Sequence, residues 1–410
     1  MASMVVRGPA LVSTTLLGAP SRCPGCALPR RSSARAAAGE GSEASGGGAK
    51  EPLLLRVARG EEAERTPVWL MRQAGRYMAD FRKFSDRLSF RERSETADIA
   101  IELSLQPWTA FQTDGVIMFS DILTPLPAIG IEFNMIKGKG PVISSPIRTL
   151  EDVKNLKTLD DPAQSLPFIS EILSSLRKEV DGKATLLGFV GTPWTLAAYA
   201  MEGMSDKSLV KTKTIMLHHP EVLHAFLRHL TDMLVTYICH QIDSGAQIVQ
   251  LFDSWAHHLS PEQFCEFSWP YAEELIDRVK SARPGVPLIF HANGGTGKLH
   301  IVAQRAHQDV VVGLDWASEM REARSQLGAG AVLQGNVDPM VLFGPEDAIR
   351  RAVEQNIRDA GGKHHILNVG HGVIQGTPED SVKFFCQLAR ESGRAGNTSH
   401  NARSGELLQV

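Results

Sequence analysis

Cysteine is scarce in this sequence, which has five in 410 residues. Cys23 and Cys26 form a CxxC pair, but a zinc ribbon needs a second pair and none follows. Cys239, Cys265 and Cys386 lie far apart in helix-like segments, where we expect small buried hydrophobes in a reducing compartment. The cysteine content therefore excludes a disulfide-stapled scaffold and gives no support for a zinc site.

Long hydrophobic runs and a basic excess are also missing. No apolar run approaches the roughly 20 residues that a helix needs to span a bilayer. The chain has 43 basic and 46 acidic residues, a net charge of −3. Six of the basic and two of the acidic residues lie in the first 50, so the remainder is more acidic still. We therefore expect neither a membrane span nor a nucleic-acid partner, and an anionic substrate would need a local basic cluster.

Acidic residues are absent before Glu40, whereas five arginines and many Ser, Ala and Gly residues precede it. This composition, with its Met-Ala-Ser start, predicts that residues 1–50 are a chloroplast transit peptide followed by the flexible linker "EGSEASGGGAK". The mature protein would then lie in the chloroplast stroma. A disordered tail without a targeting role is the alternative.

Eight short apolar runs recur after Glu51, and amphipathic segments separate them. Most are too short for buried helices and are bounded by Gly, Pro or Asp, which favours buried parallel strands. The runs cover residues 68–71, 115–119, 185–190, 247–252, 286–290, 310–314, 331–335 and 365–369.

Eight strands alternating with helices predict an α/β protein with a single (β/α)₈ TIM barrel over residues 51–392. The disordered presequence would precede it, and residues 393–410 would form a disordered C-terminal tail. An open doubly wound sheet is the alternative, but it would be favoured by a GxGxxG motif after the first strand, and that motif is missing.

Helix boundaries can be read from Pro and Gly. Residues 209–245 predict two helices interrupted at Pro220. Three later segments carry start signals that include a proline, and two of them end at a glycine. They begin at Ser260-Pro261, run from Pro345 to Gly361, and run from Thr377-Pro378 to Gly393.

Polar residues follow every apolar run, at the strand ends where a barrel of this kind carries its chemistry. One such residue alone is usually a turn former or a helix cap, but eight together favour a site. In chain order they are Arg72 and Arg76; Ser120-Asp121; Thr192, with Tyr199 beyond it; Asp253-Ser254; His291 to Gly294; Asp315-Trp316; Asn336 and Asp338; and Gly370-His371-Gly372.

Arg72 and Arg76 lie four residues apart, with no acid before Asp80. Side chains at this spacing on a helical turn point the same way, and guanidinium groups bind carboxylates through two hydrogen bonds. A structural pair with acids from elsewhere in the chain is the alternative. The small residues Ala74 and Gly75 between them favour close approach of a ligand to the backbone.

Asp121 lies in the apolar context "VIMFSDILTPLPAIG". Burial raises the pKa of such a carboxyl group unless hydrogen-bond donors hold it ionised. A helix N-cap is the alternative role. His371 lies between two glycines that leave its ring accessible, whereas Tyr199 and Ser254 supply neutral hydrogen-bonding groups.

Several segments of the sequence together resemble one family. "PVWLMRQAGRY" and "GFVGTPWTLAAYAMEG" are similar to the two signatures of the uroporphyrinogen decarboxylases. "FSDIL", "QLFDSWAHHLSP", "LQGNVDP" and "NVGHGV" match the same family in the same order. The presequence and "SFRERSET" resemble the plant form, whereas Met78-Ala79 replaces a proline that many members carry after the Arg-Tyr pair.

The resemblance implies a (β/α)₈ barrel, a homodimer and a deep cleft at the C-terminal rim. It implies decarboxylation of the four acetate side chains of uroporphyrinogen III to give coproporphyrinogen III, without metal or organic cofactor. Asp121 would accept from the pyrrole N–H groups and stabilise the cation formed on ring protonation, while Arg72 and Arg76 would bind side-chain carboxylates and either could help deliver the proton. The implied substrate-binding residues are Arg72, Gln73, Ala74, Gly75, Arg76, Phe90, Ser120, Asp121, Tyr199, Ser254 and His371.

Three other functions remain as alternatives. A zinc-dependent, corrinoid-linked methyltransferase of the same superfamily would carry a His-x-Cys pair, but this chain has His291-Ala292-Asn293. A porphyrinogen-binding protein without catalysis would keep the arginines and lose Asp121. A phosphate-binding barrel enzyme would use "GGTGK" at 294–298, which is an incomplete phosphate loop.

Overall fold

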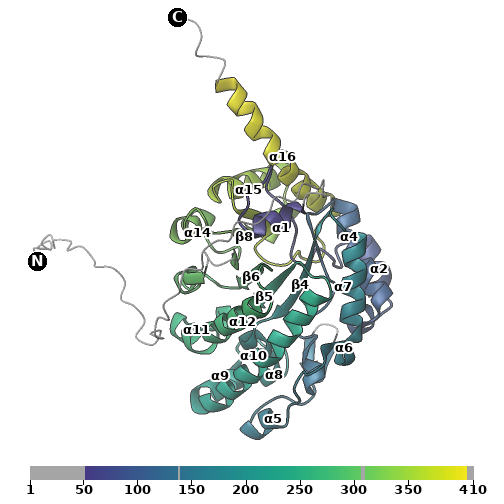
Figure 1. The fold of residues 1–410 in the computed structure, drawn as a ribbon, viewed down its shortest axis with the longest axis vertical. Helices are drawn as coiled ribbons and strands as arrows, with labels where there is room; N and C mark the ends of the chain where they lie inside the picture. Colours follow the sequence, from purple (N-terminus) through teal and green to yellow (C-terminus); the bar gives the residue numbers. More distant parts are fainter. Residues whose placement is uncertain (1–50, 137–138, 306–309, 404–410) are drawn as a thin grey trace, which may run out of the picture. The chain divides into compact units, whose positions relative to one another are not determined.

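The computed structural model describes residues 51–136, 139–305 and 310–403. Seven parallel strands form one sheet, in which each strand pairs with the next along the chain (Figure 1). These strands are β1 (Gly115–Ile117), β4 (Thr185–Gly191), β5 (Ile248–Asp253), β6 (Leu288–Ala292), β7 (Val310–Gly313), β8 (Leu333–Val337) and β9 (His365–Val369). The predicted transit peptide and linker, residues 1–50, lie outside the described residues.

The segment around Val68 closes the sheet into a barrel. Val68 forms a parallel bridge with Leu367 of β9, and its carbonyl accepts a 2.7 Å hydrogen bond from the N–H of Asp114, just before β1. The predicted barrel is therefore confirmed, but the prediction of a full strand at 68–71 is wrong. Backbone hydrogen bonds join Pro67 and Trp69 to Leu367, but the N–H groups of Val68 and Met71 donate to the side chains of Asp114 and Asn368, so side chains replace part of the strand ladder.

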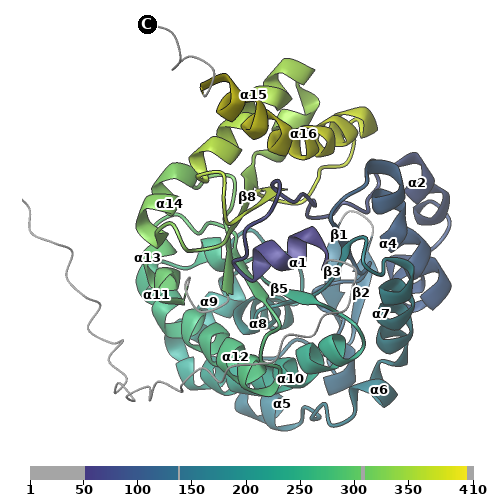
Figure 2. The same cartoon turned by 45° about the horizontal axis from the view of Figure 1, so that its top comes forward.

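Long helices cover the outside of the barrel (Figures 1 and 2). Each buries one stripe; in α7, for example, Ile169, Ile172, Leu173 and Leu176 are buried at helical spacing. The helices on the outside include α4 (Ala97–Phe111), α7 (Pro167–Glu179), α10 (Pro220–Asp243), α12 (Trp269–Ala282), α14 (Met320–Leu327), α15 (Glu346–Asp359) and α16 (Glu379–Arg403), of which α14 is the shortest.

Shorter elements fill the loops between strands and helices. A hairpin of β2 (Phe133–Ile136) and β3 (Gly140–Ile143) was not anticipated from the sequence. The short helices are α1 (Leu53–Ala58), α2 (Ala79–Ser85), α3 (Phe90–Glu95), α5 (Leu150–Lys154), α6 (Pro162–Ser165), α8 (Pro193–Glu202), α9 (Val210–His218), α11 (Pro261–Phe267) and α13 (Leu299–Val302), with 3₁₀ turns at Leu126–Ile129, Ala256–His258, Ala303–Arg305 and Pro339–Phe343.

Helix α1 closes the N-terminal end of the barrel and lies across the centre of the ring in Figure 2. Leu54 and Leu55 are buried in one cluster with Leu187, Ile248 and Ile289, which lie in the first halves of their strands. Because this end is filled with apolar side chains, the opposite end is the one left for a site.

The helix boundaries confirm some predictions and correct others. The break at Pro220 is confirmed by α9 and α10. The segment after Ser260 forms two helices, not one, because Pro270 lacks the N–H that a continuous helix would use there. Helix α16 continues past Gly393 to Arg403, since one glycine costs a helix only about 1 kcal/mol relative to alanine. Residues 404–410 of the predicted tail lie outside the described residues.

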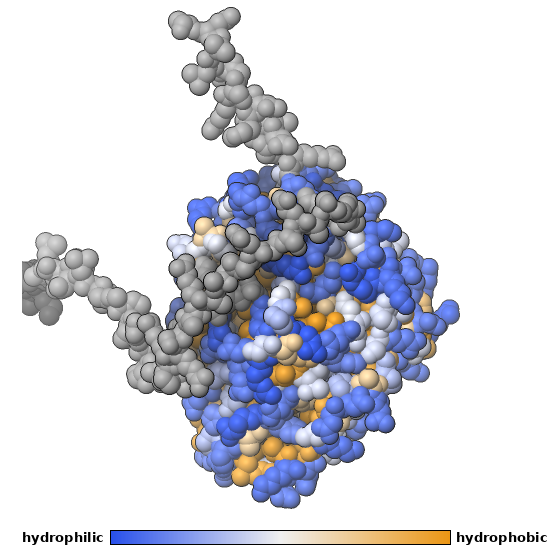
Figure 3. Space-filling model, viewed as in Figure 1, coloured by the Kyte–Doolittle hydropathy of each residue, from blue (hydrophilic) through white to orange (hydrophobic). Residues whose placement is uncertain are grey.

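The visible surface of the molecule is mainly hydrophilic, with smaller apolar areas (Figure 3). Within the described residues, no helix is long and apolar enough to cross a membrane. Of the three described cysteines only Cys386 is buried, and burial raises its pKa to about 12. Cys239 and Cys265 are partly exposed, so the prediction that all three are buried is correct for one.

Candidate active site

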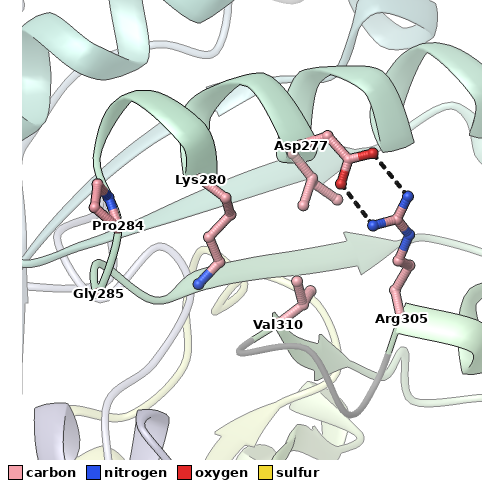
Figure 4. Close-up of a pocket in the computed structure, with 7 residues that line it drawn as sticks. Asp277, Lys280, Pro284, Gly285, Arg305 and Val310 are labelled. Carbon is pink, nitrogen blue, oxygen red and sulfur yellow. Dashed lines mark hydrogen bonds and ion pairs between the residues drawn. The ribbon is translucent and has the colours of Figure 1, made fainter. Parts of the chain in front are cut away.

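A hollow of about 230 Å³ lies at the N-terminal side of β7, away from the strand ends predicted to carry the chemistry. Lys280, Asp277 and Arg305 contribute to its lining (Figure 4). Arg305 already donates to both carboxylate oxygens of Asp277, at 2.6 and 2.8 Å, and to Glu273 at 2.8 Å. Its charge is matched within the protein, so we place the candidate active site at the C-terminal end of the strands.

A buried chain of hydrogen bonds crosses the barrel interior and reaches the loop that follows the first apolar run. Trp69 Nε1 donates to Gln334 at 2.9 Å, Gln334 to Gln250 at 3.0 Å, and Gln250 to the sulfur of Met71 at 3.5 Å. Met71 directly precedes Arg72. The backbone of Arg72 is in the left-handed region, with φ at 57°, a conformation that is uncommon outside glycine and clusters at functional sites.

The side chains of Arg72 and Arg76 have the features expected of a ligand-binding pair. Both residues are exposed, and neither forms an ion pair with any residue that the structure describes. Gly372 lets the Arg72 side chain cross the loop after β9, since a Cβ there would lie 2.3 Å from Arg72 Cδ. The structural pairing with distant acids, which the sequence left open, is therefore not found among the described residues.

Gln73 supports this loop from below. It is fully buried, and its side chain accepts from the N–H of Leu70 and donates to the carbonyl of Gly115. Its backbone carbonyl accepts a 2.6 Å hydrogen bond from the Tyr77 hydroxyl. These bonds hold the loop, and Ala74 and Gly75 are partly exposed beside it, while the contact of Gln73 with a substrate stays a prediction.

Asp121 lies in a turn after β1 and is partly buried. Its Oδ1 accepts a 2.8 Å hydrogen bond from the N–H of Leu123, so it caps this turn rather than a helix. No described residue donates a hydrogen bond to its second carboxylate oxygen. Burial raises the pKa of Asp121, while the Leu123 N–H and the positive charge of Arg72 oppose the rise.

Tyr199 and His371 lie in the same electrostatic neighbourhood. Burial raises the pKa of Tyr199, and the negative charge of Asp121 adds to the rise. Burial also lowers the pKa of His371, and the positive charge of Arg72 lowers it further. Residues from four separate segments of the chain, Arg72, Asp121, Tyr199 and His371, thus influence one another's ionisation, and His371 is favoured in its neutral form.

Asp253 ties two parts of the rim together. Its carboxylate is fully buried and accepts from the hydroxyls of Thr192 and Thr195 at 2.9 Å each and of Ser268 at 2.6 Å. Burial raises its pKa, and these hydroxyls oppose the rise. Since Thr195 is in α8, which carries Tyr199, and Asp253 precedes Ser254, this network fixes Tyr199 relative to Ser254.

The comparisons with known proteins identify the family. Residues 49–392 match the family model described as Uroporphyrinogen decarboxylase (URO-D). The "Uroporphyrinogen decarboxylase" of Crocosphaera subtropica is 53% identical over 341 residues, which cover 83% of this chain and 96% of that protein. The protein of the same name from Synechocystis sp. is 52% identical over 341 residues, covering 83% of this chain and 97% of that one. This chain belongs to the uroporphyrinogen decarboxylase family.

A solved structure gives the fold independently. The "methyltransferase from Methanosarcina mazei" aligns with a TM-score of 0.70 at 19% identity, over 83% of this chain and 99% of that one. At this identity the likeness concerns the barrel alone. The family match begins at residue 49, so the acid-poor leading segment precedes it.

The remaining predicted substrate contacts include Ser254, Ser120 and Phe90, and each makes contacts within the protein. Ser254 is partly buried and its carbonyl accepts from Asn293 at 3.2 Å, while the neighbouring Trp255 ring packs edge-on against Tyr199 at 5.1 Å. Ser120 shares a 2.8 Å hydrogen bond with the Thr124 hydroxyl. Phe90 packs against Phe119 with 5.4 Å between ring centroids. Among the described residues, no three His, Cys, Asp or Glu side chains are grouped so that they could hold a metal ion.

Two contributions were not assigned from the sequence. From the sequence, Asp253 is only a polar residue that follows a strand. Its three hydroxyl partners come from elsewhere in the chain, so no local pattern predicts them. Arg93 stands between Glu92 and Glu95 in "SFRERSET", which makes it look like one member of an ordinary charged helix surface. Only the fold reveals that Arg93 is buried.

Replacing Asp253 with Ala is expected to lower the free energy of unfolding by about 3 kcal/mol, because three hydroxyls lose a buried acceptor. Urea unfolding followed by circular dichroism measures this. The control is Asp181→Ala, which removes an exposed partner of Arg177 and should change stability by less than about 0.5 kcal/mol. Equal effects of the two substitutions would contradict the network.

Proposed function

We propose that this protein is a uroporphyrinogen decarboxylase of tetrapyrrole biosynthesis, acting on the four acetate side chains of uroporphyrinogen III to give coproporphyrinogen III and four CO₂. Family membership supports the reaction. The observation that carries the site is Asp121, a partly buried carboxylate close to the charge of Arg72. Among the described residues, its second oxygen has no donor and Arg72 has no ion-pair partner. The substrate carries many carboxylates, which explains exposed arginines without acidic partners in a mildly acidic protein.

The chemistry proposed for Asp121 is electrostatic. The open carboxylate oxygen would accept hydrogen bonds from the pyrrole N–H groups and so hold the macrocycle. When a ring carbon next to an acetate takes up a proton, the pyrrole becomes a cation that the Asp121 charge stabilises. The bond to the carboxylate then breaks and CO₂ leaves, and the electron pair of that bond forms an exocyclic methylene that neutralises the ring. A proton then adds to the methylene carbon, and the proton first taken up by the ring carbon is lost, which restores the pyrrole. Each side chain changes from CH₂–COO⁻ to CH₃ with net uptake of one proton.

The arginines would supply binding. Arg72 and Arg76 would each donate paired hydrogen bonds to substrate carboxylates, and either could help deliver the proton. Ala74 and Gly75 leave room for the macrocycle beside the loop, with Phe90, Ser120, Tyr199, Ser254 and His371 as further contacts. Neutral His371 can accept or donate one hydrogen bond at neutral pH.

An assay of residues 51–410 with uroporphyrinogen III tests the proposal directly. We expect coproporphyrinogen III to form without added metal and at an unchanged rate in the presence of a chelator. Loss of activity with chelator that zinc restores would instead favour a metal-dependent enzyme. Binding of the porphyrinogen without turnover would leave the non-catalytic alternative.

The plant origin, chloroplast location and dimeric state are further parts of this proposal. The composition of residues 1–50 supports a stromal protein, and the family resemblance supports a homodimer. Fusing residues 1–50 to a fluorescent protein tests import, and fluorescence that stays in the cytosol would refute the location. Light scattering of the purified barrel tests the dimer, and a monomeric mass at micromolar concentration would refute it.

A further inference from the structure

Arg93 in α3 is a buried cation, and no acid that the structure describes forms an ion pair with it. It is 8% exposed, and its one hydrogen bond to a described residue runs from Nε to the carbonyl of Ser89 at 3.2 Å. A guanidinium carries five N–H donors, so its two terminal amino groups have no acceptor among the residues that the structure describes. Buried arginines are normally paired, because an unpaired charge loses its hydration.

Three aromatic rings surround the Arg93 guanidinium. Its central carbon lies 5.3 Å from the ring centre of Phe81, 5.5 Å from Phe90 and 5.7 Å from Phe119. Aromatic faces attract a cation, which offsets part of the desolvation, but they do not offer the in-plane lone pairs that N–H groups of a guanidinium bind. The rings therefore hold and orient the group without satisfying its donors.

The nearby acids Glu92, Glu95 and Glu132 form hydrogen bonds with groups other than Arg93. Glu92 accepts from the backbone N–H of Ser89 at 2.7 Å and closes the capping box of α3. Glu95 accepts from Arg91 at 2.7 Å, and Glu132 accepts from Arg91 at 3.3 Å. Arg91 thus binds two of the three carboxylates and the backbone binds the third, so none of them is bonded to Arg93.

The position of Arg93 links it to the candidate active site. Phe119, one of its three rings, directly precedes Ser120 and Asp121, and Phe90 is a predicted substrate contact. Arg76 lies five residues before Phe81, one of the three rings around Arg93, and its positive charge adds to the burial that lowers the pKa of Arg93. Neither arginine forms an ion pair with an acid that the structure describes, which favours an anion on this side of the site.

We propose that Arg93 and Arg76 together hold one side-chain carboxylate of the substrate, which makes Arg93 a third arginine of the binding cleft. The inference rests on the proposed function, because the porphyrinogen supplies the carboxylate. Arg72 would face Asp121 and the reacting ring, whereas the Arg76–Arg93 pair would grip the macrocycle at the side of α2 and α3. This second point of attachment would fix the orientation of the ring over Asp121.

Steady-state kinetics with Arg93→Gln and Arg93→Lys test this inference, with Arg91→Gln as the matched control in the same helix. We expect Arg93→Gln to raise the KM for uroporphyrinogen at least about ten-fold, as for loss of a charged hydrogen bond, with kcat within about three-fold. Arg93→Lys should keep part of the affinity, and Arg91→Gln should behave as wild type. Because one carboxylate is shared, the effects of Arg76→Gln and Arg93→Gln should not add.

The melting temperature separates binding from a structural role. An unchanged KM for Arg93→Gln, whether or not its melting temperature falls, would overturn the inference. If that variant does not fold, Arg93→Lys decides, and a wild-type KM for it together with additive effects of Arg76→Gln would overturn it. Equilibrium binding of coproporphyrinogen by wild type and variants keeps the test independent of turnover. A wild type that binds but does not decarboxylate would refute the proposed function, while weaker binding by Arg93→Gln would still support the carboxylate site.

Discussion

Replacing Asp121 with Asn is expected to lower kcat by about 100- to 1,000-fold while the fold stays intact. Asn keeps an oxygen that can accept from the Leu123 N–H, so the turn after β1 survives while the charge is lost. The loss of rate would then report the missing stabilisation of the pyrrole cation. Coproporphyrinogen formation measures the rate, and far-UV circular dichroism checks the fold.

The control for this substitution is Asp232→Asn, which removes an exposed partner of Arg278 on the outside of the barrel. It should leave kcat unchanged. Near-normal turnover of Asp121→Asn would remove Asp121 from its central role, and an equal loss in both variants would point to a general effect on the fold.

The pH profile gives a second readout for Asp121. Burial raises its pKa, so the carboxylate that the reaction needs is lost at a higher pH than for a free aspartate, whose pKa is about 3.9. We expect activity to fall as the pH decreases through this raised pKa, and the residual activity of Asp121→Asn to lack the same acid limb. The same limb in both enzymes would assign it to another group.

Replacing Arg72 is expected to have the second largest effect. Arg72→Lys should lower kcat/KM at least about ten-fold, because a single ammonium cannot replace the paired hydrogen bonds of a guanidinium, and Arg72→Ala should lower it about 100-fold. Arg72→Ala should also move the acid limb of the pH profile to higher pH, since the charge of Arg72 holds the pKa of Asp121 down. The pH dependence of kcat/KM measures both effects.

Gly372→Ala tests the position of the Arg72 side chain without changing the arginine. Its new Cβ would overlap Arg72 Cδ and displace the side chain, so we expect it to reproduce part of the loss of Arg72→Lys. The control Gly182→Ala places a methyl group in open space on the surface, where a positive φ costs some stability but no affinity. Wild-type kcat/KM for Gly372→Ala would contradict the side-chain position of Arg72.

The barrel was predictable because its strands have a clear signal in the sequence. Parallel strands buried on both faces appear as short unbroken apolar runs, and seven of the eight predicted runs form strands of the sheet. The run at 68–71 resembles them equally well, but there the side chains of Asp114 and Asn368 accept two of the backbone hydrogen bonds. An apolar pattern predicts that a segment is buried, but it does not predict which groups form hydrogen bonds with the backbone of that segment.

The candidate site was predictable to the extent that its residues follow strands. Arg72, Asp121, Tyr199 and His371 could be named because the C-terminal ends of parallel strands meet at one rim. Asp253 and Arg93 could not be assigned in the same way. The partners of Asp253 come from two other segments of the chain, and the acids adjacent to Arg93 are bound to Ser89 and Arg91.

The sequence by itself determined the fold class, the family and the residue types at the rim, because periodicity and local motifs carry that information. The tertiary structure decided which charges remain unpaired. Arg305 and Arg93 are both arginines near acids in the sequence or the fold, yet Arg305 is neutralised by Asp277 and Glu273 while Arg93 is enclosed by rings. Charge pairing depends on distances of a few ångströms between segments far apart in the chain, and only folding sets those distances.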